Sequence, residues 1–108
     1  MKFLVLISIL LASFAAAAQD LTLYNKAVPS LTISGKRIAL GMTHDDFLAH
    51  VGFQPIGQVV EPDPANRRSL VIYKRYWEAK QQFLIEWRRS NDPGPYVITR
   101  IRVPAPGS

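Results

Sequence analysis

The side chains best suited to acid–base or metal chemistry lie close together near the middle of the chain. His44 is followed directly by Asp45 and Asp46, and His50, the other histidine, lies six residues after the first. Histidines that share a metal ion on one helix are four residues apart, and adjacent residues of a helix point in different directions. These four side chains do not converge, so the sequence predicts a solvated helix start here and no metal centre.

Other catalytic signatures are also missing from the sequence. It contains no cysteine, no Gly-x-Ser-x-Gly motif and no phosphate-binding glycine loop. Glu61 and Asp63 lie in a proline-rich segment that would not hold their carboxylates rigidly. Glu78 and Glu86 have Lys and Arg neighbours in the sequence, so we expect these two carboxylates to form ion pairs. We therefore expect a non-catalytic protein without a cofactor, with a site assembled from distant residues as the alternative.

The charge of the chain indicates which partners it favours. It carries 13 Lys and Arg against 8 Asp and Glu, a formal net charge of +5. This excess favours anionic lipid headgroups, anionic glycans or acidic protein faces as partners, although a modest positive charge also serves solubility alone. Nucleic acid is not an expected partner, because the chain begins with an export signal.

That signal occupies residues 1–18. Met1 and Lys2 precede an apolar run that ends in four alanines, and Gln19 and Asp20 follow. A basic start, a short apolar core and an Ala-x-Ala site are typical of a cleaved signal peptide. The alternative is a membrane anchor, but a spanning helix needs about 20 apolar residues. We expect cleavage near Ala18, no transmembrane anchor afterwards and, without a lipobox cysteine, a periplasmic or secreted protein.

The best-defined element after the signal is a short helix. Thr43 and Asp46 have the spacing of a capping box, in which the Thr hydroxyl accepts the backbone N–H three residues on. Gly41 permits a sharp turn before the helix, Gly52 can end it in the left-handed conformation, and Pro55 prevents it from restarting. The sequence predicts a helix over about 44–51 whose residues Phe47, Leu48 and Val51 share one face.

The last third of the chain reads as three antiparallel strands, at 70–77, 81–89 and 96–103. Residues alternate between the two faces of a strand. One face is expected to hold Phe83, Ile85, Trp87, Val97, Thr99, Ile101 and Val103, and to receive the helix. The opposite face is expected to hold Leu84, Glu86, Arg88, Ile98, Arg100 and Arg102. The first of the three strands is ambiguous.

The open face of this sheet is the candidate binding surface. Arginine and tyrosine are the residue types that most often anchor interfaces, and an ordinary solvated face is the alternative. The candidate residues are Lys74, Tyr76, Glu86, Arg88, Arg100 and Arg102, with Arg75 as an alternative to Lys74. Residues 52–69, which contain three prolines, are predicted to form a loop with a possible short strand at 58–60, and are a second candidate surface.

Residues 21–40 favour two short strands around a Gly35 turn, and a helix is the competing interpretation. Together these elements predict one α+β domain over residues 19–103. It has two layers, with one short helix or two packed on a three-stranded antiparallel sheet and a possible N-terminal β-hairpin. Residues 104–108 are expected to form a disordered tail.

The run Ile38–Thr43 (Ile-Ala-Leu-Gly-Met-Thr), followed by Phe47 and then by Gly52–Pro55 (Gly-Phe-Gln-Pro), resembles the signature of the BamE (SmpA/OmlA) domain family. The distance from this helix to strand residues Tyr73 and Tyr76 is also similar. By pattern, the resemblance extends over roughly 38–103. Gly-Met-Thr before a helix also occurs in small exported domains of similar architecture, such as those with the β-lactamase-inhibitor-like fold.

The resemblance implies helical elements on a three-stranded sheet and, for BamE, a periplasmic interaction module beside the outer-membrane protein assembly machinery. Two functional hypotheses follow. The first is an exported module that binds an envelope protein. The second is an electrostatic binder of anionic lipid or glycan, and inhibition of a secreted enzyme is a further alternative based on fold analogy.

Overall fold

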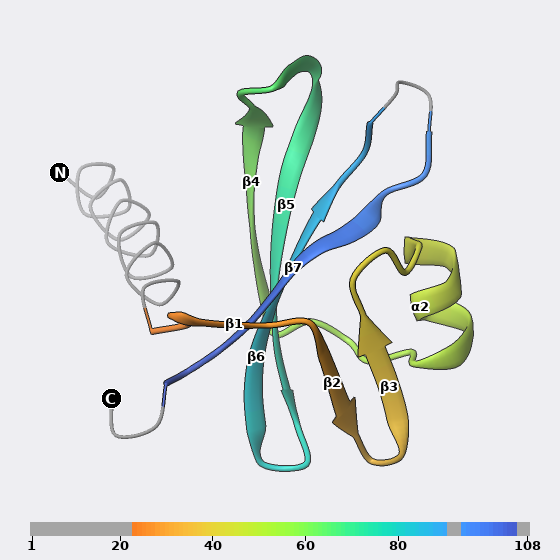
Figure 1. The fold of residues 1–108 in the computed structure, drawn as a ribbon, viewed down its shortest axis with the longest axis vertical. Coiled ribbons are helices and arrows are strands. Elements are labelled where there is room, and N and C mark those ends of the chain that lie inside the picture. Colours follow the sequence, from red (N-terminus) through yellow and green to blue (C-terminus); the bar gives the residue numbers. More distant parts are fainter. Residues whose placement is uncertain (1–22, 91–93, 106–108) are drawn as a thin grey trace, which may run out of the picture.

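The computed structural model describes residues 23–90 and 94–105, so the expected signal peptide, residues 1–18, lies outside the described residues. Within them, five antiparallel strands form one sheet in the order β1-β7-β6-β5-β4, and two strands form a separate hairpin (Figure 1). The elements are β1 Lys26–Val28, β2 Ser30–Ile33, β3 Lys36–Ala39, α2 His44–His50, β4 Gly57–Asp63, β5 Asn66–Glu78, β6 Gln81–Arg88 and β7 Val97–Val103.

The predicted fold class is wrong. The described chain is mostly β, with one helix of seven residues, and its main sheet has five strands where three were expected. The three expected strands are its centre, β5, β6 and β7. The two additional strands, β1 and β4, are the edges, and β1 pairs with a strand more than 70 residues away in the chain. A three-residue strand with so distant a partner leaves no local pattern in the sequence.

The predicted loop over 52–69 is also wrong. The strand suspected at 58–60 extends over the whole of β4 and pairs with β5. Asp63 Oδ1 accepts the Ala65 N–H (2.9 Å) in the turn between the two strands, and Asn66 Oδ1 accepts the Arg68 N–H (3.2 Å) at the start of β5. Pro62 is tolerated because β4 is an edge strand, where a missing N–H need not break a ladder. Prolines that indicated a loop therefore lie in and beside a strand.

The hairpin expected around Gly35 is confirmed. β2 and β3 pair from Ser30↔Ala39 to Ile33↔Lys36. Ser34 and Gly35 in the turn have φ values of 54° and 76°, and a tight two-residue hairpin turn of this kind requires positive φ at both positions. The hairpin places Ile33 and Ile38 in the core, with 2% and 0% of their surface exposed.

The predicted helix is confirmed as α2. Thr43 Oγ1 accepts the Asp46 N–H at 3.1 Å. Gly52, with φ 71°, follows the helix, and its N–H donates to the Phe47 carbonyl at 2.9 Å. Gly41, with φ 87°, precedes it, and its N–H donates to the Ile98 carbonyl at 2.8 Å. Pro55 lies in the irregular segment between α2 and β4. The five expected structural positions thus surround α2 as the sequence indicated.

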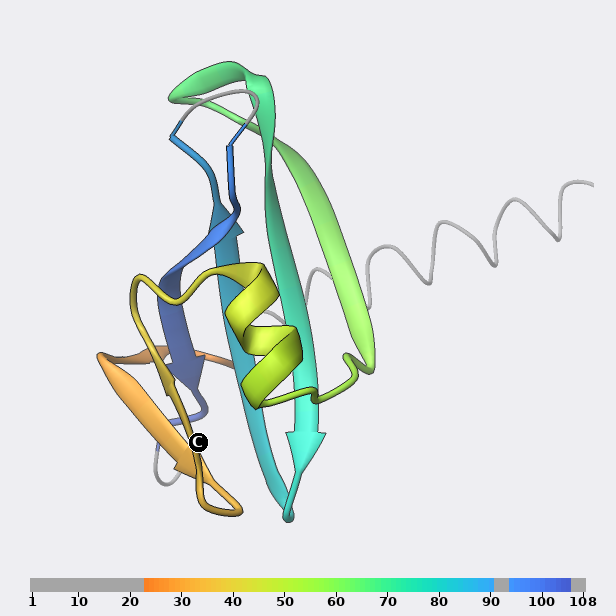
Figure 2. The same ribbon diagram turned by 90° about the vertical axis from the view of Figure 1, so that its right-hand side faces the viewer.

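The core lies between one face of the five-stranded sheet and a layer made of α2 and the β2–β3 hairpin (Figure 2). Phe83, Ile85 and Trp87 point into it as predicted and are at most 1% exposed. Phe47 contacts the rings of Trp87 and Tyr76, with centroids 5.3 and 5.6 Å apart. Leu48, expected on the same helix face, is half exposed and does not belong to the core.

A bulge in β7 overturns part of the predicted face assignment. Glu86 pairs with Arg100 and Trp87 pairs with Ile98, so Thr99 is left without a partner. One extra residue reverses the alternation of a strand. Ile98 and Ile101 therefore both face the core, at 1% and 0% exposed, whereas Thr99 lies on the opposite face, where its hydroxyl reaches Glu86.

Candidate functional site

The face of the sheet opposite α2 carries a cluster of arginine side chains. Paired residues of antiparallel strands share a face, and the pairs are Tyr73↔Glu86, Arg75↔Leu84, Leu84↔Arg102 and Glu86↔Arg100. Arg88 joins them because it is two residues after Glu86 on β6. We call this surface the arginine face. It consists of Tyr73, Arg75, Leu84, Glu86, Arg88, Arg100 and Arg102.

The structure brings together four of the six predicted site residues on the arginine face: Glu86, Arg88, Arg100 and Arg102. The other two, Lys74 and Tyr76, lie on the core side of the sheet. Lys74 pairs with Ile85, and Tyr76 pairs with Phe83 and is 1% exposed. Sequence reasoning missed Tyr73. The pairing register of β5 with β6 determines the face on which each β5 side chain lies, and it pairs Tyr76 with the core residue Phe83.

Glu86 is the centre of a polar network on this face. It is 5% exposed, its Oε2 accepts the Thr99 hydroxyl at 2.7 Å, and the same oxygen lies 3.4 Å from Arg88 Nε. Arg88 Nη1 also lies 3.8 Å from Oδ1 of the buried Asp63. Arg88 therefore links two carboxylates and joins the end of β4 to β6. It has a structural role and is a poor candidate for contacting a partner.

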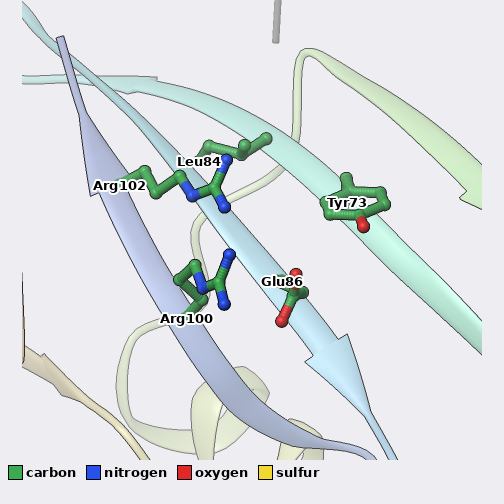
Figure 3. Close-up of a pocket in the computed structure, with 5 residues that line it drawn as sticks. All are labelled: Tyr73, Leu84, Glu86, Arg100 and Arg102. Atoms are coloured by element: carbon green, nitrogen blue, oxygen red, sulfur yellow. The ribbon is translucent and has the colours of Figure 1, made fainter. Parts of the chain in front are cut away.

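Arg100 and Arg102 are arranged differently. Figure 3 shows both side chains reaching from β7 across β6, toward Leu84 and Glu86, while Tyr73 lies over β5 on the other side. Among the described residues, neither arginine forms an ion pair. Leu84, beneath them, is 2% exposed. The depression between these residues is too shallow to hold a water-sized molecule. The arginine face therefore has no room for a ligand between Arg100, Arg102 and Tyr73, and neither guanidinium group has an ion-pair partner among the described residues.

A small pocket opens on the opposite face of the sheet, next to the start of α2. We call it the Lys74 pocket. It offers about 130 Å³ to water-sized molecules, and it is lined by His44, Ile72, Lys74, Trp87 and Tyr96. The His44 ring meets the Trp87 ring edge-on with centroids 5.0 Å apart, and its Nε2 lies 3.3 Å from Lys74 Nζ. The lysine ammonium donates to this nitrogen when the imidazole is neutral.

Both basic groups of the Lys74 pocket have lowered pKa values. Burial lowers the pKa of His44 most, the positive charge of Lys74 lowers it further, and Asp45 raises it in part. Burial alone lowers the pKa of Lys74. Burial disfavours the charged form of both groups and the Lys74 charge disfavours the imidazolium further, whereas the Asp45 carboxylate favours it. The pocket therefore contains a partly buried cation whose nearest polar partner is a neutral imidazole.

Two further features of the described chain bear on chemistry. Among residues 23–90 and 94–105, no three His, Asp or Glu side chains come together as metal ligands. In the same residues no helix has the length and apolar character needed to cross a bilayer.

Comparison with models of known protein families, with curated proteins and with solved structures found no match to this chain. The similarity to the BamE family therefore stays a prediction from the residues of one segment.

Proposed function

We propose that this chain is an exported, non-catalytic module that binds an acidic segment of another envelope protein through the arginine face. The observation that carries the proposal is the pair Arg100 and Arg102. Both extend over an apolar floor, and neither is neutralised by a carboxylate in the described chain. The one carboxylate beside them, Glu86, is already engaged by Arg88 and Thr99.

The chemistry of the arginine face favours a protein partner. A guanidinium group binds a carboxylate through two parallel hydrogen bonds, and the partly buried Tyr73 ring supplies aromatic contact area next to it. Pockets for small molecules are concave and enclose most of the ligand. The surface around Arg100 and Arg102 has no pocket of this kind, so it fits a macromolecule better than a metabolite.

Placement in the cell envelope rests on the sequence. The predicted signal peptide supports export, and the similarity of Ile38–Pro55 to the BamE signature supports an interaction role in the periplasm. Neither observation identifies the partner, so the partner is described by its chemistry, as a segment rich in Asp or Glu.

A site-specific crosslinking experiment tests the proposal. A photo-reactive amino acid replaces Tyr73 in the full chain, and crosslinked proteins are identified in cells of the source organism. The crosslinked segment should be acidic, and a synthetic peptide of that segment should bind the purified domain. Binding should weaken at least tenfold in the double variant Arg100→Glu, Arg102→Glu, and it should fall with added salt, because the screening length shortens to about 3 Å at 1 M.

The matched control is Arg37→Glu, which reverses an exposed arginine on the β2–β3 hairpin, away from the arginine face. It should leave peptide binding unchanged. The proposal is wrong if the double variant and the control lose the same affinity, or if the crosslinked segment is not acidic. If anionic vesicles or glycan fragments bind in an arginine-dependent way and no peptide does, the domain is an electrostatic binder of lipid or glycan instead.

A further inference from the structure

The core face of the sheet is not covered along its whole length. The β4–β5 end projects beyond α2 in both ribbon views (Figures 1 and 2). The strand pairing puts Val60 of β4 and Leu70 of β5 on the core face, and they are 45% and 43% exposed. Val60 pairs with Ile72, which lines the Lys74 pocket. A strip of apolar surface therefore leads directly to the pocket from one side.

The pocket has a charge that the described chain does not compensate. Its lining contains the lysine ammonium, an imidazole, two aromatic side chains and an isoleucine, and no carboxylate. Within residues 23–90 and 94–105, Lys74 Nζ has a single polar contact, with His44 Nε2. A cation that is partly removed from water is unfavourable unless an anion or several hydrogen bonds compensate it. An incoming carboxylate would provide this compensation.

The volume of the Lys74 pocket limits the size of the group that can carry this carboxylate. A water molecule occupies about 30 Å³ in the liquid, so 130 Å³ holds a carboxylate with one or two methylene groups. Pockets for drug-sized ligands start at about 300 Å³. The adjoining apolar strip adds room for one or two apolar side chains of the same peptide.

We propose that the Lys74 pocket binds an Asp or Glu side chain of a partner protein, with a neighbouring apolar residue of that partner resting on Val60 and Leu70. The carboxylate accepts a hydrogen bond from Lys74 Nζ and lies against the aromatic walls formed by Trp87 and Tyr96. This site does not depend on the arginine face, because it opens on the other side of the sheet.

The test uses short blocked peptides and NMR spectroscopy of the isotope-labelled full chain. The probe is acetyl-Leu-Glu-Leu-amide, and acetyl-Leu-Gln-Leu-amide is the neutral control of the same shape. The Glu peptide should shift the signals of His44 and the Trp87 indole, and it should raise the pKa of His44 because a negative charge then lies nearby. The Gln peptide should bind about two- to fivefold more weakly, as expected for loss of one partly exposed ion pair.

Variants of the chain complete the test. Lys74→Met should remove the preference for Glu over Gln, Lys74→Arg should retain it, and Arg100→Glu should not change it. Equal shifts with the two peptides, or an unchanged preference in Lys74→Met, would overturn the proposal. A third peptide, acetyl-Leu-Leu with a free carboxyl end, distinguishes a terminal carboxylate from a side chain. If that peptide binds and the Glu peptide does not, the assignment to an acidic side chain is wrong.

Discussion

Replacing Phe47 by alanine should destabilise the fold by about 3–4 kcal/mol, near the lower end of the range measured for buried phenylalanines. The Phe47 side chain is 1% exposed, and its ring contacts Tyr76 and Trp87 with centroids 5.6 and 5.3 Å away. It is the one buried residue within α2 itself. Val51, just after the helix, is the other buried residue of this segment, so loss of the Phe47 ring should loosen the packing of α2 on the sheet.

Urea unfolding followed by fluorescence and circular dichroism measures this effect. For a domain of this size the free energy of unfolding falls by about 1 kcal/mol per molar urea, so the midpoint should drop by about 3 M. The matched control is Leu48→Ala, the next residue of the same helix, which is 51% exposed and should lose less than about 1 kcal/mol. A difference between the two variants below about 1.5 kcal/mol would refute the placement of α2 on the sheet.

Three further predictions follow from local contacts. Because the pKa of His44 is lowered in the folded state, the unfolded chain takes up a proton at a higher pH than the folded chain does, so the free energy of unfolding should fall as the pH drops through 6.5. The variant His44→Gln should reduce this loss, which urea unfolding at about pH 8 and about pH 5.5 measures. Thr99→Val removes the hydroxyl that donates to Glu86 Oε2 and should lower the free energy of unfolding by about 1–2 kcal/mol. Gly52→Ala should cost about 1 kcal/mol by thermal or urea unfolding, because φ is 71° and the added methyl meets only an ordinary contact at 3.5 Å.

Each of these predictions has its own control. An equal pH dependence in the wild-type chain and in His44→Gln would contradict the first. The control for Thr99→Val is Thr32→Val on the exposed face of the hairpin, which should change the free energy of unfolding by less than about 0.5 kcal/mol. A similar loss of stability in Thr32→Val and Thr99→Val would show that the hydrogen bond from Thr99 to Glu86 is not stabilising. For the third, Gly52→Asn should be milder than Gly52→Ala, because Asn adopts positive φ more readily. The reverse order would contradict the strain argument.

Elements governed by nearby residues were predictable. The capping pair Thr43 and Asp46, the Gly52 stop and the Gly35 turn each act within a few residues, so the sequence predicted α2 and the β2–β3 hairpin with nearly the observed bounds. The three central strands have clear apolar runs and were predicted as well. The edge strands were not, because an edge strand is stabilised by pairing on one side and tolerates residues, such as Pro62, that normally indicate a loop.

The candidate site was predictable only where strict alternation holds. Glu86, Arg100 and Arg102 share a face as expected, and their pairing confirms it. Lys74 and Tyr76 were assigned to the wrong face, because both faces of β5 are mixed in polarity and only its register on β6 decides between them. The Lys74 pocket had no sequence signal, since its walls come from α2, β5, β6 and the segment before β7.

By itself, the sequence determined the short-range features of this protein: the capped helix, the tight hairpin turn, the alternating strands of the sheet centre and the basic character of the chain. These depend on backbone propensities and on side chains a few residues apart. The tertiary structure decided the edges of the sheet, the face on which each β5 side chain lies and the bulge that turns Thr99 toward Glu86. The physical reason is that strand pairing joins residues distant in sequence, and a shift of one residue moves every following side chain to the opposite face.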